Sequence, residues 1–335
     1  MMANNATTAA RTRSVPLVVV EGNIGAGKTT LIQGLKEKGY RVFLEPTVTN
    51  PYLEKFYEDS KTYAFPLQMW MLERRFLWFL KAVEMSWADS YASTEEMPKG
   101  LLLDRSVYSD KVFAVQNHLD GNISEEQFAA YTERLNDIKT RIPLPNALVY
   151  LDVTAARCHQ RVMARCRECE MGIPKAYLAN LGLRYEELVA EFTDVADVEV
   201  LNFRTHADDD DLSQPDTFVD CADVAARLED VMSKRSLCRA VFTEEEKVKI
   251  RALITKMETE MNVVKEQIAE RQLHDDETER RSVSPKQRSA TPVSTKRSQK
   301  TTFESPTSII TPSTSADSDH PVASTINFSE AVEAV

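Results

Sequence analysis

Residues 18–30 read VVVEGNIGAGKTT, and the rest of the chain is organised around this stretch. Residues 22–29 match G-x-x-x-x-G-K-T, the pattern of a glycine-rich loop that surrounds the phosphates of a nucleotide. An apolar, β-branched run at residues 15–20 precedes the loop, and a helical pattern follows it. The glycines allow backbone N–H groups and the helix N-terminus to face an anion. We therefore expect a strand, a phosphate-binding loop and a helix, in that order.

Two side chains of the loop have expected roles of their own. Lys28 would reach the terminal phosphates, and the Thr29 hydroxyl would bind Mg²⁺. A glycine-rich turn that binds nothing is the alternative, and the flanking strand and helix argue against it. The expected ATP-binding residues of the loop are Gly22, Asn23, Ile24, Gly25, Ala26, Gly27, Lys28, Thr29 and Thr30.

Composition excludes several classes of protein. The 335 residues carry a net charge of -11, which argues against a nucleic-acid partner and a basic membrane-surface protein. No apolar run approaches the length of a bilayer span. An odd number of cysteines, 5, without a secretory signal favours a reducing compartment, and we expect the cytoplasm.

The N-terminal residues 1–14 read MMANNATTAARTRS. They have the composition of an organelle transit peptide, which would direct the chain to mitochondria, but they are short for one. We therefore interpret them as a disordered leader and expect the folded domain to cover residues 15–237.

Strand-like and helical segments alternate along this domain. After the strand at residues 15–20, further strands are predicted at residues 40–44, 101–103, 147–151 and 198–203. Helices are expected from Pro51, over residues 65–87, after Asp104-Arg105-Ser106, from Ser124, from Thr154 and over residues 220–232. This alternation predicts a three-layer α/β/α domain around a five-stranded parallel sheet.

Charged residues follow two of the predicted strands. Glu45 ends the second strand, and Asp104 and Arg105 end the third. Open α/β sheets bind ligands at the carboxyl ends of their strands, so Glu45 is a candidate general base. A solvated acid at the strand end is the alternative.

The long helix at residues 65–87 is apolar all round and should be buried. Gln68 and Arg75 are its exceptions, and they lie about two turns apart on one face. Because buried polar groups need partners, they either face a cleft or pair internally.

Three arginines, Arg161, Arg165 and Arg167, crowd the end of the helix that begins near Thr154. Like charges this close indicate a bound anion, so we expect a lid over the triphosphate rather than a solvated face. The lid also contains Cys166 and Cys169, but positive neighbours disfavour a zinc site there.

The chain changes character after the domain. Thr243 and Glu246 form a capping box for an amphipathic helix at residues 243–273. The helix has an apolar stripe that consists of Ile250, Ile254, Met257, Met261, Val264 and Ile268. Such a stripe fits either a helix docked on its own domain or a contact between two copies of the chain. Residues 274–335 are rich in Ser, Thr and Pro and are expected to be disordered.

Several of these motifs together resemble the deoxyribonucleoside kinases. They are EGNIGAGKTT, Leu44-Glu45-Pro46, Tyr57 followed by Gln68, Asp104-Arg105-Ser106 and the arginine lid, in the family's order and spacing. Thymidylate kinases share a P-loop and an Asp-Arg element but not the Glu-Pro and Tyr/Gln features. The resemblance covers residues 15–235 and implies a P-loop kinase fold.

The resemblance implies transfer of the γ-phosphoryl group of ATP to the 5′-hydroxyl of a deoxyribonucleoside. Glu45 would accept the hydroxyl proton, while Arg105 orients that hydroxyl and stabilises charge with Lys28. Asp104 would hold Mg²⁺ together with Thr29.

The resemblance also assigns residues to the nucleoside. Tyr57 and Glu170 would bind the sugar 3′-hydroxyl, Gln68 the base edge, and Phe113 would stack on the base. The resemblance also assigns Arg75 and Asp110 to the substrate. They match a charged pair around the base in deoxycytidine and purine deoxynucleoside kinases.

The Arg75/Asp110 pair bears on base preference. It presents polar edges where thymine's methyl group needs an apolar surface, so we expect deoxyadenosine or deoxyguanosine first, deoxycytidine next and thymidine last. Several animal members carry a Trp where this chain has Asn50, which is a departure from the family pattern.

Two other functions compete with this one. A nucleoside monophosphate kinase would need a further basic anchor for the phosphate of its acceptor, and a nucleotide-binding scaffold would not need Lys28, Glu45, Asp104 and Arg105 intact. We expect ATP and a deoxyribonucleoside as ligands, Mg²⁺ as cofactor, a homodimer, and neither nucleic acid nor a membrane as partner.

Overall fold

The computed structural model describes residues 15–44, 50–87, 97–167, 170–205, 212, 215–234 and 242–282. All of them belong to the first of the chain's two compact units, Met1–Arg297. The expected leader and most of the expected disordered tail lie outside the described residues.

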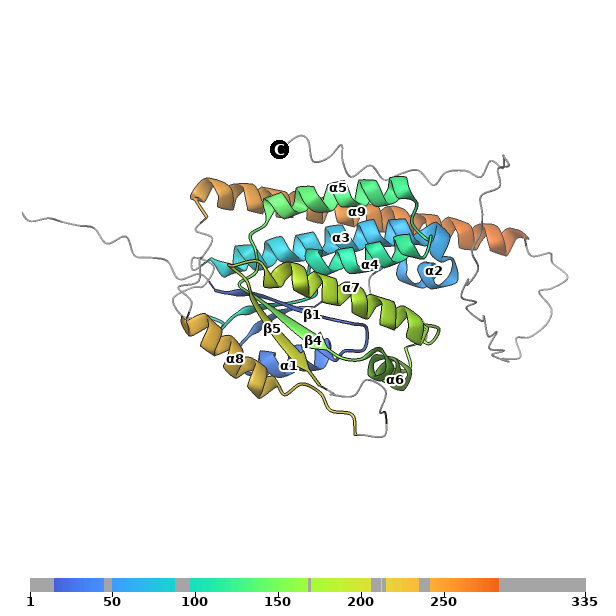
Figure 1. Cartoon of the computed structure of the whole chain (residues 1–335). Coiled ribbons are helices and arrows are strands. Elements are labelled where there is room, and N and C mark those ends of the chain that lie inside the picture. The colour runs from blue at the N-terminus through green and yellow to red at the C-terminus, as the bar shows by residue number, and fades with distance from the viewer. Residues whose placement is uncertain are drawn as a thin grey trace, which may run out of the picture. The chain divides into compact units, whose positions relative to one another are not determined.

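A five-stranded parallel sheet organises the described residues (Figure 1). Its strands are β1 (Leu17–Gly22), β2 (Arg41–Phe43), β3 (Leu101–Asp104), β4 (Ala147–Asp152) and β5 (Glu199–Arg204). The order across the sheet is β2-β3-β1-β4-β5, with Val18 beside Leu102 on one side and Ala147 on the other. The expected five-stranded parallel sheet is confirmed, with strand ends shifted by about two residues.

Helices cover both faces of the sheet. Figure 1 shows α3 (Ser60–Ser86), α4 (Val107–Leu119), α5 (Glu125–Arg141), α7 (Lys175–Thr193) and α9 (Glu244–Ser282) on one face, and α1 (Lys28–Glu37) and α8 (Cys221–Lys234) on the other. The remaining described helices are α2 (Leu53–Glu58) and α6 (Ala155–Arg165). The three-layer α/β/α architecture predicted from the sequence is confirmed.

Two apolar cores lie between the sheet and its helix layers. Val19 belongs to the core that includes α3, α4 and α7, whereas Val18 and Val20 belong to the core with α1 and α8. Successive side chains of a strand point to opposite faces, so a central strand buried on both faces is apolar throughout. This is why β1 carries the unbroken run before the phosphate-binding loop.

Side-chain caps set several helix starts. α3 begins at Ser60 rather than at residue 65, because the Asp59 carboxylate accepts the Thr62 N–H at 3.2 Å, and Pro66 lies inside the helix. α2 begins at Leu53, so Pro51 precedes the helix instead of opening it. The expected cap at Ser124 is confirmed.

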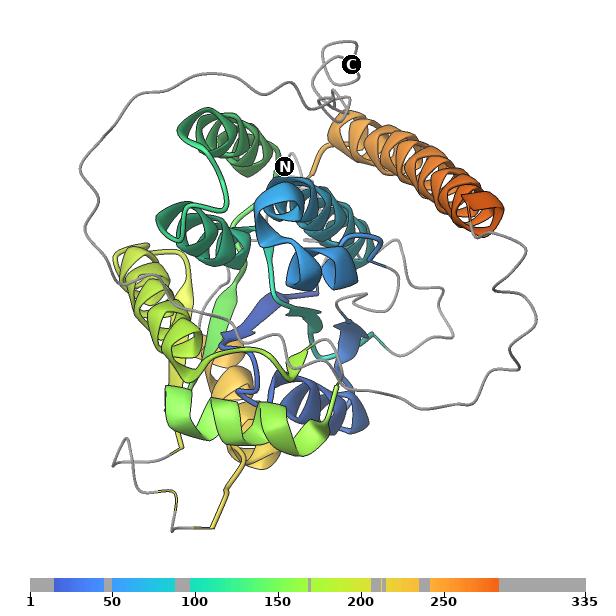
Figure 2. The same cartoon turned by 90° about the vertical axis from the view of Figure 1, so that its right-hand side faces the viewer.

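The C-terminal helix α9 packs against α3. Figure 2 shows α9, in orange, at the outer side of the helix layer. Thr243 and Glu246 form the predicted capping box. The apolar stripe from Ile250 to Val264 is buried, and most of it lies in the same core as α3, so the stripe is used within the chain. The side chain of Ile268 lies outside the described ones.

α9 also extends to Ser282 instead of ending at residue 273. Residues 274–282 contain no proline or glycine and are rich in Glu and Arg, which favour the helix, so our boundary for the tail was wrong. None of the described helices is both long enough and apolar enough to cross a membrane.

Candidate active site

The phosphate-binding loop joins β1 to α1 and has the backbone that its glycines permit. Gly25 and Gly27 have φ angles of 82° and 99°, which L side chains rarely adopt. A Cβ at Gly25 would lie 2.5 Å from the carbonyl oxygen of Cys158 on α6. The strand, loop and helix lie in the predicted order, and glycine at residue 25 also allows the close approach of α6.

Lys28 is the first residue of α1 and points back into the loop. Its Nζ donates hydrogen bonds to the carbonyl oxygens of Gly22 and Asn23, at 2.9 and 2.8 Å. The N-cap residue, Gly27, has no side chain, so no side-chain cap binds the N–H groups of the first helical turn. The N-terminus of α1 and the Lys28 ammonium are therefore positioned for an anion in the loop.

Arg105 lies beside this loop, directly after β3. Its backbone is left-handed, with φ 66°, and its N–H donates to the Val20 carbonyl at 3.1 Å. The register pairs Val20 with Asp104, so both charged residues lie at the carboxyl edge of the sheet. The Arg105 guanidinium donates to the Tyr185 hydroxyl and lies 4.8 Å from the centroid of Phe113.

Glu21 is a buried acid within the otherwise apolar β1. Its carboxylate accepts a hydrogen bond from Ser106 at 2.7 Å. Burial raises the pKa of Glu21, while hydrogen bonds from Ser109 and Ser106 and the charge of Arg105 partly offset this rise. Glu21 was not predicted as a site residue, although an acid inside a central apolar strand is a visible signal in the sequence.

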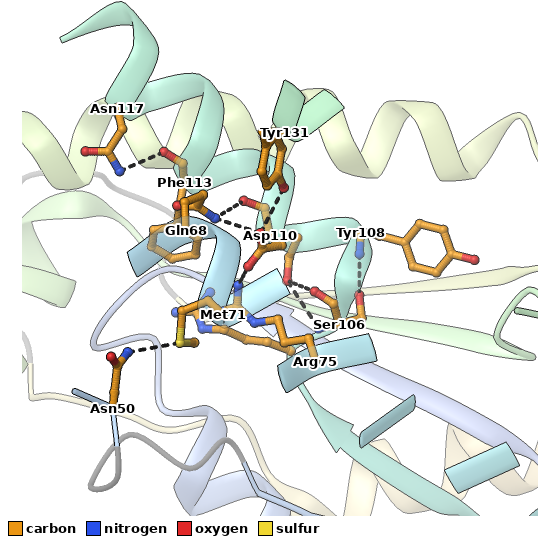
Figure 3. Close-up of polar contacts among 12 residues, drawn as sticks. Asn50, Gln68, Met71, Arg75, Ser106, Tyr108, Asp110, Phe113, Asn117 and Tyr131 are labelled. Atoms are coloured by element: carbon orange, nitrogen blue, oxygen red, sulfur yellow. Dashed lines mark hydrogen bonds and ion pairs between the residues drawn. The ribbon is translucent and has the colours of Figure 1, made fainter. Parts of the chain in front are cut away.

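Asp110 lies in the first turn of α4 and is completely buried. It forms an ion pair with Arg75 and accepts from Gln68 Nε2, which lies 2.7 Å from Oδ2 and 3.0 Å from the backbone carbonyl (Figure 3). Gln68 and Arg75 share one face of α3, as the sequence predicted. Arg75 pairs with Asp110, as the family resemblance implies, whereas the contact of Gln68 with Asp110 was not predicted.

Phe113 connects this group to Arg105. Its ring centroid lies 5.8 Å from the Arg75 guanidinium and 4.8 Å from that of Arg105. The polar group on α3 and α4 is therefore next to the residue that borders the phosphate-binding loop.

A hollow lies beside these residues, between β2, β3 and α3. It is lined by Phe43, Leu44, Met71, Arg74, Arg75, Trp78, Leu103, Asp104 and Arg105. Asn50, the departure from the family pattern, donates to Met71 Sδ at 3.2 Å (Figure 3). Glu45 follows Leu44 but lies outside the described residues, so its role as base stays a prediction.

The three expected lid arginines have different partners. Arg161 binds the Asp216 carboxylate, with Nη2 2.8 Å from Oδ1, and its Nη1 donates to the Ala26 carbonyl at 2.8 Å. Its guanidinium also lies 4.3 Å from the centroid of Phe218, a ring that would meet a Cβ at Gly27 at 2.9 Å. Arg161 thus joins α6, the loop and the segment before α8.

Arg165 and Arg167 both pair with Glu170. Arg165 forms an ion pair with its carboxylate, and Arg167 Nη1 lies 3.5 Å from Oε1. The spacing of the arginines led us to expect one cluster, but Arg165 ends α6 and Cys166 turns the chain with φ 50°. Tyr57 is half-buried on α2, and its pairing with Glu170 at a sugar stays a prediction.

The two side chains expected to hold Mg²⁺, Thr29 and Asp104, both carry oxygen atoms. Thr29 is exposed at the start of α1, and Asp104 ends the neighbouring strand β3. Mg²⁺ bound with a nucleotide takes one or two protein oxygens plus phosphates, so this donor set fits it. Within the described part of the chain, no group of three or more His, Cys, Asp or Glu side chains forms a metal site.

A family model described as deoxynucleoside kinase matches residues 18–221. The chain belongs to the deoxynucleoside kinase family. The matched range of this deoxynucleoside kinase family member includes the phosphate-binding loop, Arg105, Asp110, Arg161 and Phe218. It ends at the first residue of α8, so α9 lies outside the match.

Two relatives and one solved structure each align with between 52% and 65% of this family member. A deoxyguanosine kinase of Dictyostelium discoideum is 43% identical over 176 residues, which are 52% of this chain and 59% of that protein. A deoxyadenosine/deoxycytidine kinase of Bacillus subtilis is 31% identical over 180 residues, 52% of this chain and 77% of that protein. The structure of a deoxyadenosine kinase from M. mycoides with bound dATP aligns with a TM-score of 0.48 and 24% identity, over 65% of this chain and 98% of that one.

Asp216 and Phe218 are candidate site residues that could not be predicted from the sequence. They lie in the segment before α8, and no local pattern marks the sequence DTFVD as part of a nucleotide site. Only their contact with Arg161, an expected ATP-binding residue, places them there.

Proposed function

We propose that the chain transfers the γ-phosphoryl group of ATP to the 5′-hydroxyl of a deoxyribonucleoside. The observation that carries the proposal is the position of Phe113 between Arg75 and Arg105, at 5.8 and 4.8 Å. It joins a buried polar group suited to a base to a cation beside the phosphate-binding loop. A kinase that acts on a nucleoside needs these two features side by side.

The transfer step requires positioning and positive charge rather than a covalent intermediate. The nucleoside 5′-oxygen attacks the γ-phosphorus, the bond to the β–γ bridging oxygen breaks, and ADP leaves. Glu45 takes the proton of the 5′-hydroxyl. Lys28 and Arg105 stabilise charge on the transferring group, and Mg²⁺ held by Thr29 and Asp104 would neutralise the phosphates.

No cysteine is needed as a nucleophile. The buried thiol of Cys158 is adjacent to the loop, but burial raises its pKa to about 11, so it stays protonated. This agrees with direct transfer between the two substrates.

The base preference follows from the acceptors around Asp110. The Gln68 amide nitrogen is turned toward Asp110, which leaves its Oε1 to accept a hydrogen bond from a base. Adenine, guanine and cytosine carry an amino group, whereas thymine carries a carbonyl and a methyl group. We propose that deoxyadenosine or deoxyguanosine is preferred, then deoxycytidine and last thymidine; the names of the Dictyostelium and Bacillus relatives include the first three nucleosides and not thymidine.

Phosphorylation of deoxyadenosine, deoxyguanosine, deoxycytidine and thymidine by the purified chain tests this function. Glu45→Gln should lower turnover by about 10²–10⁴-fold, because it removes the base. Glu58→Gln is the control, since Glu58 is an exposed glutamate on α2. Thymidine preference would contradict only the base assignment.

Two further outcomes would reject the proposal. Turnover of thymidylate but of no nucleoside would indicate a monophosphate kinase, and nucleotide binding without any turnover would indicate a scaffold. The cytoplasmic location and the homodimer remain predictions of the sequence, and gel filtration measures the second.

A further inference from the structure

The Asp110 carboxylate is held by side chains from two helices. Gln68 and Arg75 reach it from α3, and Tyr131 reaches it from α5, where its hydroxyl donates to Oδ2 at 2.8 Å. Figure 3 shows the Tyr131 hydroxyl directed at Asp110 from the side opposite Arg75. Tyr131 is therefore the contact of α5 with the site described above.

The environment of Tyr131 makes its hydroxyl a permanent donor. The side chain is 1% exposed and stacks on Phe128, with ring centroids 6.3 Å apart. Burial raises the pKa of Tyr131, so the hydroxyl keeps its proton at any physiological pH. A buried hydroxyl costs free energy unless it is hydrogen-bonded, and Asp110 supplies that bond.

The three donors divide the two carboxylate oxygens between them. Arg75 binds Oδ1, whereas Gln68 and Tyr131 both bind Oδ2. Without the Tyr131 hydroxyl, Oδ2 would keep only the Gln68 amide, whose side chain is the one that also faces the base. The amide and the carboxylate would then be free to change orientation together.

We propose that Tyr131 is a positioning residue for base recognition, because its hydroxyl fixes the orientation of the Asp110 carboxylate and thereby of the Gln68 amide. The inference rests on the proposed function and adds to it a determinant on α5. Its ligand class is a nucleoside whose base carries an amino group. Tyr131 acts through Asp110 and touches no reacting atom.

A Tyr131→Phe variant removes the hydroxyl and keeps the ring. We expect kcat/KM for the preferred amino-bearing nucleoside to fall by about tenfold through KM, with kcat and the KM for ATP unchanged. Turnover of thymidine should fall less, so discrimination against thymidine decreases. Tyr108→Phe is the matched control, because Tyr108 is a buried tyrosine on α4 that points away from Asp110 (Figure 3).

A double-mutant cycle with Asp110→Asn tests whether Tyr131 acts through Asp110. If it does, the double variant has the same KM for the nucleoside as Asp110→Asn alone. Additive losses would overturn the inference, as would a Tyr131→Phe variant that behaves like Tyr108→Phe. An equal loss for all nucleosides and for ATP, or a failure of Tyr131→Phe alone to fold, would assign the hydroxyl a structural role instead.

The wild-type assay separates the inference from the proposed function. No turnover of any nucleoside by the wild-type chain would reject both. Normal wild-type turnover with no effect specific to Tyr131→Phe would reject the inference and leave the proposed function in place.

Discussion

The Ser106 hydroxyl donates a hydrogen bond to the buried Glu21 carboxylate at 2.7 Å. Ser106 is the N-cap of α4, and Glu21 precedes the phosphate-binding loop, so this bond ties the helix that carries Asp110 to the strand that carries the loop. Arg105 directly precedes Ser106 in the sequence. The bond therefore connects the two halves of the proposed site.

Glu21 should make the stability of the chain depend on pH. Because burial raises the pKa of Glu21 above its ordinary value of 4.5, the folded state holds the proton more tightly than the unfolded state. Its contribution is present below pH 4.5 and is lost as the pH rises through the raised value. Glu21→Gln does not titrate, so its stability relative to wild type should increase with pH.

Urea unfolding at a series of pH values measures this difference. Each unit by which the pKa is raised corresponds to about 1.4 kcal/mol. Glu58 is exposed, so the plot of unfolding free energy against pH for Glu58→Gln should be parallel to that of wild type. Parallel curves for Glu21→Gln and wild type would show that Glu21 does not titrate differently on folding.

Gly25→Ala should destabilise the loop and abolish ATP binding. The new Cβ would meet the Cys158 carbonyl at 2.5 Å in a backbone with φ 82°. Gly121→Ala is the control, because Gly121 has a similar φ of 71° but nothing within 4 Å. The free energy of unfolding of the control variant should fall by about 1–2 kcal/mol, because of backbone strain alone.

The difference between the two glycine variants isolates the contact with α6. We expect the free energy of unfolding of Gly25→Ala to fall by at least about 1 kcal/mol more than that of the control. Calorimetry should detect no ATP binding by Gly25→Ala. Equal losses, with ATP binding retained, would show that α6 moves aside without cost.

Arg161→Lys should weaken ATP binding selectively. Lysine cannot reproduce the paired contacts of Arg161 with Asp216 and Ala26. We expect the KM for ATP to rise by about tenfold with the KM for the nucleoside unchanged. Arg227→Lys is the control, since Arg227 also covers a ring, that of Phe203, but is half exposed; equal effects of both variants would contradict the assignment.

The helix α9 should stabilise the kinase domain. Ile254 is 6% exposed in the core that includes α3, so Ile254→Ala should cost about 2–4 kcal/mol. Val263 lies on the same helix but is 45% exposed, and Val263→Ala should cost less than about 0.5 kcal/mol. Urea unfolding compares the two variants.

Deleting residues 240–335 consequently removes part of the core together with the tail. A variant that ends after Ser282 tests the effect of the tail on activity better than this deletion does, because it keeps all of α9. Equal stability of the Ile254→Ala and Val263→Ala variants would show that α9 is not docked in solution.

Local sequence patterns predicted most of the helices and strands and the phosphate-binding loop. Strand periodicity, the capping residues Ser124 and Thr243, and the glycines of the loop act within a few residues, so their effects can be predicted without the fold. The family resemblance added the pairing of Arg75 with Asp110. It did not extend to α9, for which the sequence left two interpretations open.

Contacts between segments that are distant in the chain come from the folded structure alone. It brought Phe218 to Arg161, Tyr131 to Asp110, and α9 onto α3. Each of these contacts depends on where two elements lie on the sheet, and no local pattern encodes that position. Their physical cause is burial: polar side chains in the interior must find partners, and apolar faces must find one another, wherever the fold places them.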